Sequence, residues 1–434
     1  MSSAQNLADF LNKCHSVFHA TANLENELKD SGFKELKEQD SWKLESNQRY
    51  YVKRNNSSII AFDLPLMSDV KSLNIVASHS DSPCFKVKPV SDLNDGHYNR
   101  LNVEAYGGAI YSTWLDRPLG LAGRVMVKED NNLVSKLVDF DKDMALIPNV
   151  AIHQNREVNN GYKWNVQKDM LPLIGLEQGD DYLLKLLGEK LDVNTDSIMG
   201  YDLFLYNRTS AYIWGENDEF ISAPRLDDLA CAYTSLEAFK KAHSNHSVNI
   251  YAVFDNEEVG SVTRQGMAST FLSDVINRVL DSFDLTKEEK ATVMANSFMV
   301  STDNAHAIHP NHPELYDETN HAYLNKGVVI KRCASQSYVT DAVSEAVTRQ
   351  LCANSKVPYQ FFANRSDVRG GGTQAAIASF NIPSMSVDIG LPQLAMHSSF
   401  ETAGSKDVDY MIRLLEEFYN SSVITNGNDV KVSR

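Results

Sequence analysis

Four apolar, strand-like segments of this chain each end in acidic or histidine residues, and helix-like segments lie between them. The four segments are LNIVASHSDSP (73–83), SVNIYAVFDNEE (247–258), SFMVSTDNAH (297–306) and IPSMSVDIGLPQLAMH (382–397). Strands that alternate with helices form a largely parallel sheet, and ligands bind at the carboxyl ends of its strands. The sequence therefore predicts a three-layer α/β fold, with a mostly parallel sheet, in which these polar strand ends are neighbours in space.

The stretch from about residue 92 to 214 has a different character, because it is richer in Gly, Asn and aromatic residues. Its short strand-like runs, such as AGRVMVK (122–128) and NLVSKLVDF (132–140), lack regular helical spacers. We interpret it as a β-rich insertion into the α/β domain. The predicted domains are a discontinuous catalytic domain, residues 1–92 and 216–434, and an inserted β-rich domain, residues 93–215.

The N-terminal segment predicts one long helix, because apolar side chains recur at roughly helical spacing from residue 4 to about residue 32. Two strand-like segments follow, RYYVKRN (49–55) and SSIIAFDL (57–64). They lead into the first of the four apolar strands.

The composition and charge exclude some classes of partner. The 434 residues are 43% hydrophobic and 23% charged, as in an ordinary globular protein of two or three domains. The formal net charge of −16 would repel nucleic acid and anionic membrane surfaces at long range. A local basic pocket could still bind a small acidic ligand, because salt confines electric fields to about 8 Å.

The cysteines and the apolar runs predict a cytoplasmic protein. The five cysteines are odd in number and scattered, and no CxxC pair is present, so neither a disulfide framework nor a thiolate metal site is indicated. The N-terminus has no basic region followed by an apolar core, and no uninterrupted apolar run approaches the ~18 residues that span a bilayer. A reducing cytoplasm fits these features best.

Polar residues at the strand ends and one loop form a possible metal site. Taken singly, each has another explanation: a loop histidine is commonly a surface residue, and acidic residues before a helix favour its N-terminus. Taken together, two histidines and several carboxylates are the ligand inventory of a site for two borderline divalent metals, such as zinc. The residues are His79, Asp81, Asp227, Asp228, Glu257, Glu258, Asp303 and His397.

The adjacent pair Glu257 and Glu258 supports a metal site, because burying ionised carboxylates costs several kcal/mol unless a cation or hydrogen bonds compensate. Without a metal, both side chains would be solvated at the start of a loop. Two cations about 3.5 to 4 Å apart need a bridging carboxylate. One glutamate of the pair would then hold a metal, while its neighbour would take a proton from the water between the metals.

Five motifs in this order resemble those of the aspartyl aminopeptidase family of dinuclear zinc exopeptidases: SHSDSP, PRLDD, DNEEVGS, STDNAHAIHPN and LPQLAMHS. The resemblance extends over essentially the whole chain, and NRSDVRGGGT (364–373) is closer to bacterial-type members. It implies a metal-dependent aminopeptidase that releases one N-terminal residue, Asp or Glu by preference, from peptides. It also implies a homo-oligomer, a dodecamer, assembled through the inserted dimerisation and oligomerisation domain.

The resemblance implies two zinc ions per subunit, other divalent metals being possible. His79 and Asp303 would bind one zinc ion, and Glu258 and His397 would bind the other. Asp227 would bridge the two ions.

The resemblance also implies roles for residues around the metals. Glu257 would be the general base that activates the dizinc-bridging water, and His306 would stabilise the tetrahedral intermediate. Asp81 would accept the second imidazole N–H of the nearby zinc-binding histidine. Lys331 would bind the acidic side chain of the substrate. His153 would reach the active site of a neighbouring subunit, although from the sequence it could equally be a metal ligand.

Other functions remain open at this stage. A broad-specificity aminopeptidase or another dinuclear amidohydrolase, such as a carboxypeptidase or deacylase, would use the same ligands. A metal-stabilised scaffold without activity would have no need of Glu257 as a proton acceptor. A serine hydrolase built on SHSDSP would lack a nucleophile elbow.

Overall fold

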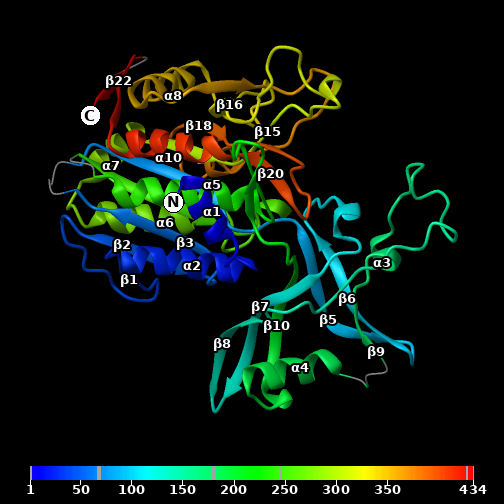
Figure 1. Cartoon of the computed structure of the whole chain (residues 1–434). Helices are drawn as coiled ribbons and strands as arrows, with labels where there is room; N and C mark the ends of the chain where they lie inside the picture. The colour runs from blue at the N-terminus through cyan, green and yellow to red at the C-terminus, as the bar shows by residue number, and fades with distance from the viewer. Residues whose placement is uncertain are drawn as a thin grey trace.

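The computed structural model describes residues 2–65, 70–176, 179, 181–243, 246–426 and 429–433. These residues form a larger α/β part and a smaller β-rich part that projects from it (Figure 1). No helix in the described residues has both the length and the apolar character that would carry it across a membrane.

The α/β part is built on a sheet of nine strands among the described residues. The central strands β13, β4, β14 and β18 run parallel to one another, and antiparallel pairs join them to the outer strands. In spatial order the strands are β1 (Lys34–Leu36), β2 (Arg49–Arg54), β3 (Ser58–Asp63), β13 (Ser247–Phe254), β4 (Ser72–His79), β14 (Phe298–Thr302), β18 (Met385–Gly390), β16 (Val328–Lys331) and β17 (Tyr359–Phe362).

Helices cover both faces of this sheet, because its central strands are apolar on both sides. On β13, Tyr251 and Val253 belong to one hydrophobic core, and Ile250 and Ala252 belong to the other. The predicted three-layer α/β architecture is therefore confirmed. The first core includes residues of α1 (Ser3–Leu11), α2 (Val17–Asp30), α5 (Leu226–Lys241), α8 (Ala342–Ser355) and α10 (Ser405–Tyr419), and the second includes residues of α6 (Phe271–Asp281), α7 (Lys287–Ala295) and α9 (Gln374–Ala378).

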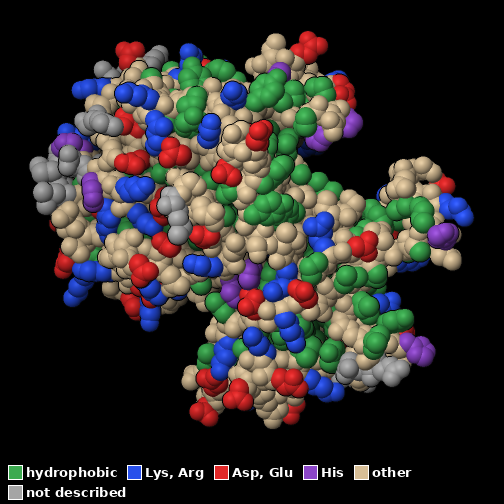
Figure 2. Space-filling model, in the orientation of Figure 1, with side chains coloured by type: hydrophobic (Ala, Val, Ile, Leu, Met, Phe, Trp, Pro, Cys, Tyr) green, Lys and Arg blue, Asp and Glu red, His purple; other side chains and the backbone are tan. Residues whose placement is uncertain are grey.

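The prediction of one N-terminal helix is wrong, because the segment forms two helices, α1 and α2. The hydroxyl of Ser16 accepts a hydrogen bond from the N–H of His19 and caps α2, as serine commonly does at a helix start. The break between the helices turns His15 toward the β-rich part, where its Nδ1 lies 2.5 Å from Oδ2 of Asp139. Figure 2 shows histidine, basic and acidic side chains gathered where the two parts meet.

The β-rich part contains a six-stranded antiparallel sheet with its own hydrophobic core. The predicted boundary at residue 93 falls inside β5 of this sheet, and the division into two domains stays a prediction. The strands, in spatial order, are β8 (Asn132–Asp139), β7 (Leu119–Glu129), β10 (Ile198–Asn207), β5 (Cys84–Asn94), β6 (Tyr98–Tyr106) and β9 (Leu173–Leu176), and the helices are α3 (Val166–Asp169) and α4 (Tyr182–Leu191).

Two smaller sheets complete the described chain. The five-stranded one joins the end of the β-rich segment to strands near the carboxyl ends of the central sheet. Its strands are β11 (Tyr212–Trp214), β12 (Phe220–Ala223), β20 (Glu401–Gly404), β19 (Pro392–Leu394) and β15 (Ala305–His306), while β21 (Ser422–Asn426) and β22 (Asp429–Ser433) form a hairpin.

Candidate metal centre

Three of the predicted polar segments meet at the carboxyl edge of the central sheet. His79 is the last residue of β4, and it pairs in register with Phe254, the last residue of parallel β13. The short 3₁₀ turn after β13 carries Glu257 and Glu258. On the other side of β4, β14 ends at Thr302, and Asp303 follows immediately. Parallel strands thus bring these side chains to one edge, as the sequence predicted.

The other two predicted ligands come from a helix start and a loop. Asp227 is buried in the first turn of α5, where its backbone is not helical, and Ser82 donates a hydrogen bond of 2.6 Å to its carbonyl oxygen. His397 follows β19, and its Nδ1 lies 3.0 Å from the carbonyl oxygen of Gly108. That contact orients the ring so that Nε2 faces the carboxylates.

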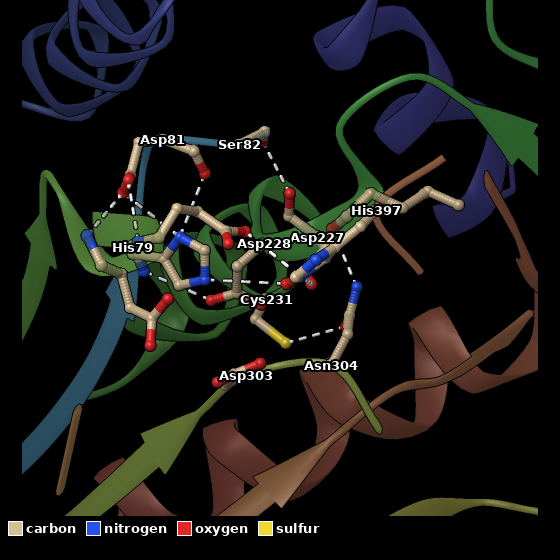
Figure 3. A network of polar contacts seen from close by, with 12 residues as sticks. His79, Asp81, Ser82, Asp227, Asp228, Cys231, Asp303, Asn304 and His397 are labelled. Atoms are coloured by element: carbon tan, nitrogen blue, oxygen red, sulfur yellow. Dashed lines mark hydrogen bonds and ion pairs between the residues drawn. The ribbon is translucent and has the colours of Figure 1, made fainter. Parts of the chain in front are cut away.

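Asp227 lies between the two histidines, and the three side chains point toward one another in Figure 3. Its Oδ1 is 3.6 Å from Nε2 of His79, and its Oδ2 is 3.5 Å from Nε2 of His397. Glu258 Oε1 is also 3.5 Å from that second imidazole nitrogen. Three sets of potential ligand atoms, each within 4.8 Å of one another, are His79, Asp227 and Asp303; Asp227, Glu258 and His397; and His79, Glu257 and Glu258.

The oxygen atoms of this cluster fit a cation. Asp227 Oδ1 and Glu258 Oε1 are buried and accept no hydrogen bond from the described residues. A buried carboxylate oxygen without a donor is costly unless a positive charge lies nearby. Imidazole nitrogens with carboxylate oxygens form the donor set that zinc commonly takes. The residues present therefore fit one or more zinc ions.

The pKa values of the cluster show how strongly its carboxylates interact. Burial raises the pKa of Glu258 well above its usual value, and the charge of Asp227 adds to this effect. Burial and the charges of Asp303 and Asp81 raise the pKa of Glu257 to about 7. Burial also opposes ionisation of Asp227, but the two histidines beside it outweigh this and lower its pKa. The site is electrostatically crowded with carboxylates, which a bound cation would relieve.

Asp81 holds the turn that carries the glutamate pair. Its two carboxylate oxygens accept the backbone N–H groups of Glu257 and Glu258, each at 3.1 Å, and the hydroxyl of Tyr106 at 2.6 Å. The Nδ1 atom of His79 lies 3.0 Å from the carbonyl oxygen of Asp81 and 3.4 Å from its carboxylate. The backbone of Asp81 is thus closer to the imidazole than the carboxylate that the sequence suggested.

Glu401, like Asp81, accepts backbone N–H groups of the metal cluster, and sequence reasoning missed it. This glutamate is 2% exposed, and it accepts the N–H of Asp227 at 3.0 Å and the N–H of His397 at 2.7 Å. The single signal in the sequence was its position four residues after His397. One buried carboxylate therefore fixes the backbone of two predicted ligands from different segments.

Lys331 and His306 lie in the same cleft as the predicted ligands, a space of about 160 Å³. The ammonium of Lys331 is buried and lies 3.5 Å from Oδ1 of Asp303. Burial lowers the pKa of this lysine, but the nearby negative charges, that of Asp303 first, together outweigh it and raise the pKa overall. The structure thus brings both residues beside the cluster.

His153 lies apart from the cluster. It is exposed, in the segment of the β-rich part that precedes α3, and it does not line the cleft. Its predicted role in a neighbouring subunit stays a prediction.

The sequence as a whole matches a family model described as "Aminopeptidase I zinc metalloprotease (M18)" over residues 10–419. The chain belongs to the M18 aminopeptidase family. The resemblance to aspartyl aminopeptidases is confirmed, and the protein is a zinc metalloaminopeptidase, a hydrolase of peptide bonds.

Named M18 proteins resemble the chain over nearly its whole length. "Probable M18 family aminopeptidase 2" of Clostridium acetobutylicum is 43% identical, over 96% of this chain and 98% of that protein. The protein of the same name from Pseudomonas aeruginosa is 41% identical, with the same coverage.

Solved structures of M18 aminopeptidases have a similar fold. The structure described as "Cryo-EM structure of the Ape4 and Nbr1 complex" is 35% identical, with a TM-score of 0.91 over 96% of this chain and 85% of that one. The one described as "Structure of S. cerevesiae mApe1 dodecamer" is 27% identical, with a TM-score of 0.83 over 96% of each chain.

Proposed function

We propose that this M18 aminopeptidase holds two zinc ions and releases N-terminal Asp or Glu from peptides. The position of Asp227 carries the proposal, because its two oxygens face two different histidines at 3.6 and 3.5 Å. One ion would be held by His79 and Asp303 and the other by Glu258 and His397, with Asp227 shared. Both groups match sets of ligand atoms that lie within 4.8 Å of one another.

Bound zinc supplies a Lewis acid that polarises the scissile carbonyl and lowers the pKa of water. The chain contributes the proton transfer. Glu257 lies beside the cluster, and its backbone is fixed by Asp81, so that its carboxylate can accept the proton of the attacking water. The same carboxyl group then gives the proton to the leaving amine, and the exposed imidazole of His306 at the cleft can donate a hydrogen bond to the developing oxyanion.

Lys331 provides the basis for the preference for acidic substrates. Its ammonium lines the cleft, and an acidic side chain of the substrate would pair with it. The lysine already lies 3.5 Å from Asp303, which favours a second candidate function, an aminopeptidase of broad specificity. In that case the role of Lys331 would be to compensate the charge of Asp303.

We further propose that the chain forms a homo-oligomer, a dodecamer like that of S. cerevesiae mApe1. The exposed position of His153 on the projecting β-rich part would allow it to reach the cleft of a neighbouring subunit. Light scattering of the purified chain would test the subunit number.

A panel of short peptides, with zinc content measured on the same sample, tests the function. We expect about two zinc ions per subunit and cleavage of free-amine peptides that begin with Asp or Glu. Cleavage of N-blocked peptides, or release of C-terminal residues, would instead identify a deacylase or a carboxypeptidase. Equal rates on Asp and Leu peptides would select broad specificity.

Replacement of Lys331 tests the specificity within the same panel. Lys331→Met should reduce kcat/KM for Asp substrates by at least about 10-fold more than for Leu substrates, because it removes a buried charge that pairs with the acidic side chain. Lys326→Met, at an exposed position of the same segment, is the matched control. An equal loss on both substrates would assign the lysine to the metal centre.

A further inference from the structure

A second and larger cavity lies behind the metal centre. It measures about 570 Å³, within the range of small-molecule sites. The break between α1 and α2, strands β5 and β10, and the segment after β13 form its wall. None of the proposed metal ligands lines it, but Asp81 and Glu401, which hold the ligand backbones, do. The cavity is therefore a space separate from the cleft that contains the metal cluster.

Two residues of this wall carry buried N–H groups without an acceptor in the described chain. They are the Nε of Arg225 and the Nε1 of Trp114. A buried donor without a partner destabilises the fold, so native proteins usually satisfy it with protein, water or ligand. The wall contributes unpaired donors and, among the described residues, no unpaired acceptor. The buried polar atoms without partners in this wall are therefore donors, and the carboxylates of the same wall already accept hydrogen bonds; these are Asp81, Asp202, Asp255 and Glu401.

The other cationic groups deep in the wall already have partners. Arg124 and Lys86 both pair with Asp202, at 2.9 and 2.8 Å. Arg225 makes no ion pair with a described carboxylate, and its one hydrogen bond is a long contact of 3.4 Å to the carbonyl oxygen of Leu11. The terminal nitrogens of the Arg225 guanidinium thus keep hydrogen-bonding capacity for an occupant of the cavity.

Part of the remaining wall is aromatic. Phe18, Phe204, Tyr206 and Trp114 all line the cavity. The guanidinium carbon of Arg225 lies 5.9 Å from the centre of the Tyr206 ring, so the charge sits beside this aromatic surface. A planar guanidinium next to aromatic rings suits a carboxylate attached to an apolar body.

We propose that this cavity binds a small organic carboxylate with an apolar body. The carboxylate would accept hydrogen bonds from the terminal nitrogens of the Arg225 guanidinium, and the apolar body would pack on the aromatic residues. The molecule could be a free amino acid, such as the enzyme would release, or an unrelated carboxylic acid. Both share the chemistry that the wall recognises.

A matched pair of ligands tests the proposal by calorimetry on the full-length, zinc-loaded protein. The acid 3-phenylpropionate should bind with a Kd of about 1 mM or tighter. Its uncharged amide, 3-phenylpropionamide, should bind at least about 10-fold more weakly, because it lacks the charge that pairs with the guanidinium. Tighter binding of L-phenylalanine than of 3-phenylpropionate would identify amino acids as the occupants, and the reverse order would identify simple carboxylic acids.

Arg225→Gln should weaken binding of the acid at least about 10-fold and leave binding of the amide unchanged. Arg349→Gln, on the exposed surface of α8, is the control and should bind both like the wild type. Equal affinities of acid and amide would overturn the proposal. So would an unchanged affinity in Arg225→Gln, which would place the acid at the zinc ions.

Hydrogen exchange on the wild-type protein covers the case in which Arg225→Gln does not fold. Binding of 3-phenylpropionate should slow exchange in the cavity segments 80–86 and 202–207. Protection confined to residues 303–306 and 395–398 would assign the acid to the metal cleft and overturn the proposal. The absence of both heat and protection would overturn the proposal as well.

Discussion

The metal cluster and the cavity behind it differ in which buried polar atoms lack a hydrogen-bond partner. In the cluster, buried oxygens of Asp227 and Glu258 have no donor, whereas in the cavity wall buried N–H groups of Arg225 and Trp114 have no acceptor among the described residues. Unpaired oxygens indicate a cation, and unpaired N–H groups indicate an acceptor. Two neighbouring regions of one chain therefore lack opposite kinds of hydrogen-bond partner.

The two regions share a boundary formed by two buried carboxylates. Asp81 and Glu401 line the cavity and also hold backbone N–H groups of the metal cluster. Their side chains accept these hydrogen bonds and stand between the two regions. The comparison predicts that changes to one region act on it first, and on the other only through this boundary.

Removal of the metal should have the largest effect, and this effect should be confined to the metal cluster. Treatment with 1,10-phenanthroline should abolish peptidase activity, and added zinc should restore it. The melting temperature should also fall, because a ligand that binds only the folded state stabilises it. Binding of 3-phenylpropionate should persist, since no proposed metal ligand lines the cavity. Activity that is indifferent to the chelator would contradict a metal-dependent mechanism.

Glu257→Gln should have the second-largest effect, a loss of at least about 100-fold in kcat, because an amide cannot accept the proton of the attacking water. Zinc content should stay at the wild-type level, since the proposed ligand is the adjacent Glu258. Glu45→Gln, at an exposed surface position, should have wild-type activity. Near-normal turnover of Glu257→Gln at full zinc content would remove this residue from the base role.

The sequence predicted the elements that depend on local pattern. His79 and Asp303 could be placed at one sheet edge because each lies at the end of an apolar strand, and the parallel ends of such strands meet. The adjacent glutamates after β13 could be noticed for the same reason. The distances between these side chains could not be predicted, because they depend on the register between β4 and β13.

Other parts of the site depend on tertiary contacts that no local pattern records. The N-terminal helix breaks before Ser16, although the apolar spacing continues through the break. Glu401 acts by accepting N–H groups from two distant segments, and its own neighbours in the sequence give no sign of this. Arg225 stands in the PRLDD motif, but its lack of an acidic partner among the described residues becomes visible only when the surrounding segments are in place.

Glu401→Gln should have an intermediate effect, which acts through the shared boundary. A glutamine oxygen can accept one N–H, but its amide group would face the other, so the backbones of Asp227 and His397 would no longer be held together. We expect zinc affinity to fall by about 10- to 100-fold, as for other groups that orient metal ligands. Excess zinc should restore most of kcat. A loss of kcat that zinc does not restore would argue for a direct role in catalysis.

Asp139→Asn should have the smallest effect, and it tests whether the wall of the cavity is stabilised separately from the metal. The carboxylate of Asp139 contacts His15 at 2.5 Å and accepts the hydroxyl of Tyr206 at 2.9 Å, and both partners line the cavity. Burial opposes ionisation of Asp139, but the hydrogen bonds from His15, the backbone of Asp141 and Tyr206 together outweigh it and lower the pKa to about 2. We expect the substitution to cost about 1–2 kcal/mol of unfolding free energy at pH 7, measured by urea denaturation.

The sign of the pKa shift predicts how this difference varies with pH. A carboxyl group whose pKa is lower in the folded state stabilises the fold above its unfolded pKa, which is about 3.9. The difference between wild type and Asp139→Asn should therefore be constant from pH 7 to about pH 5, and should shrink as the pH falls further toward 2. Zinc content at pH 7 should be unchanged. If zinc were lost together with stability, the two regions would form one cooperative unit, and the boundary at Asp81 and Glu401 would not separate them.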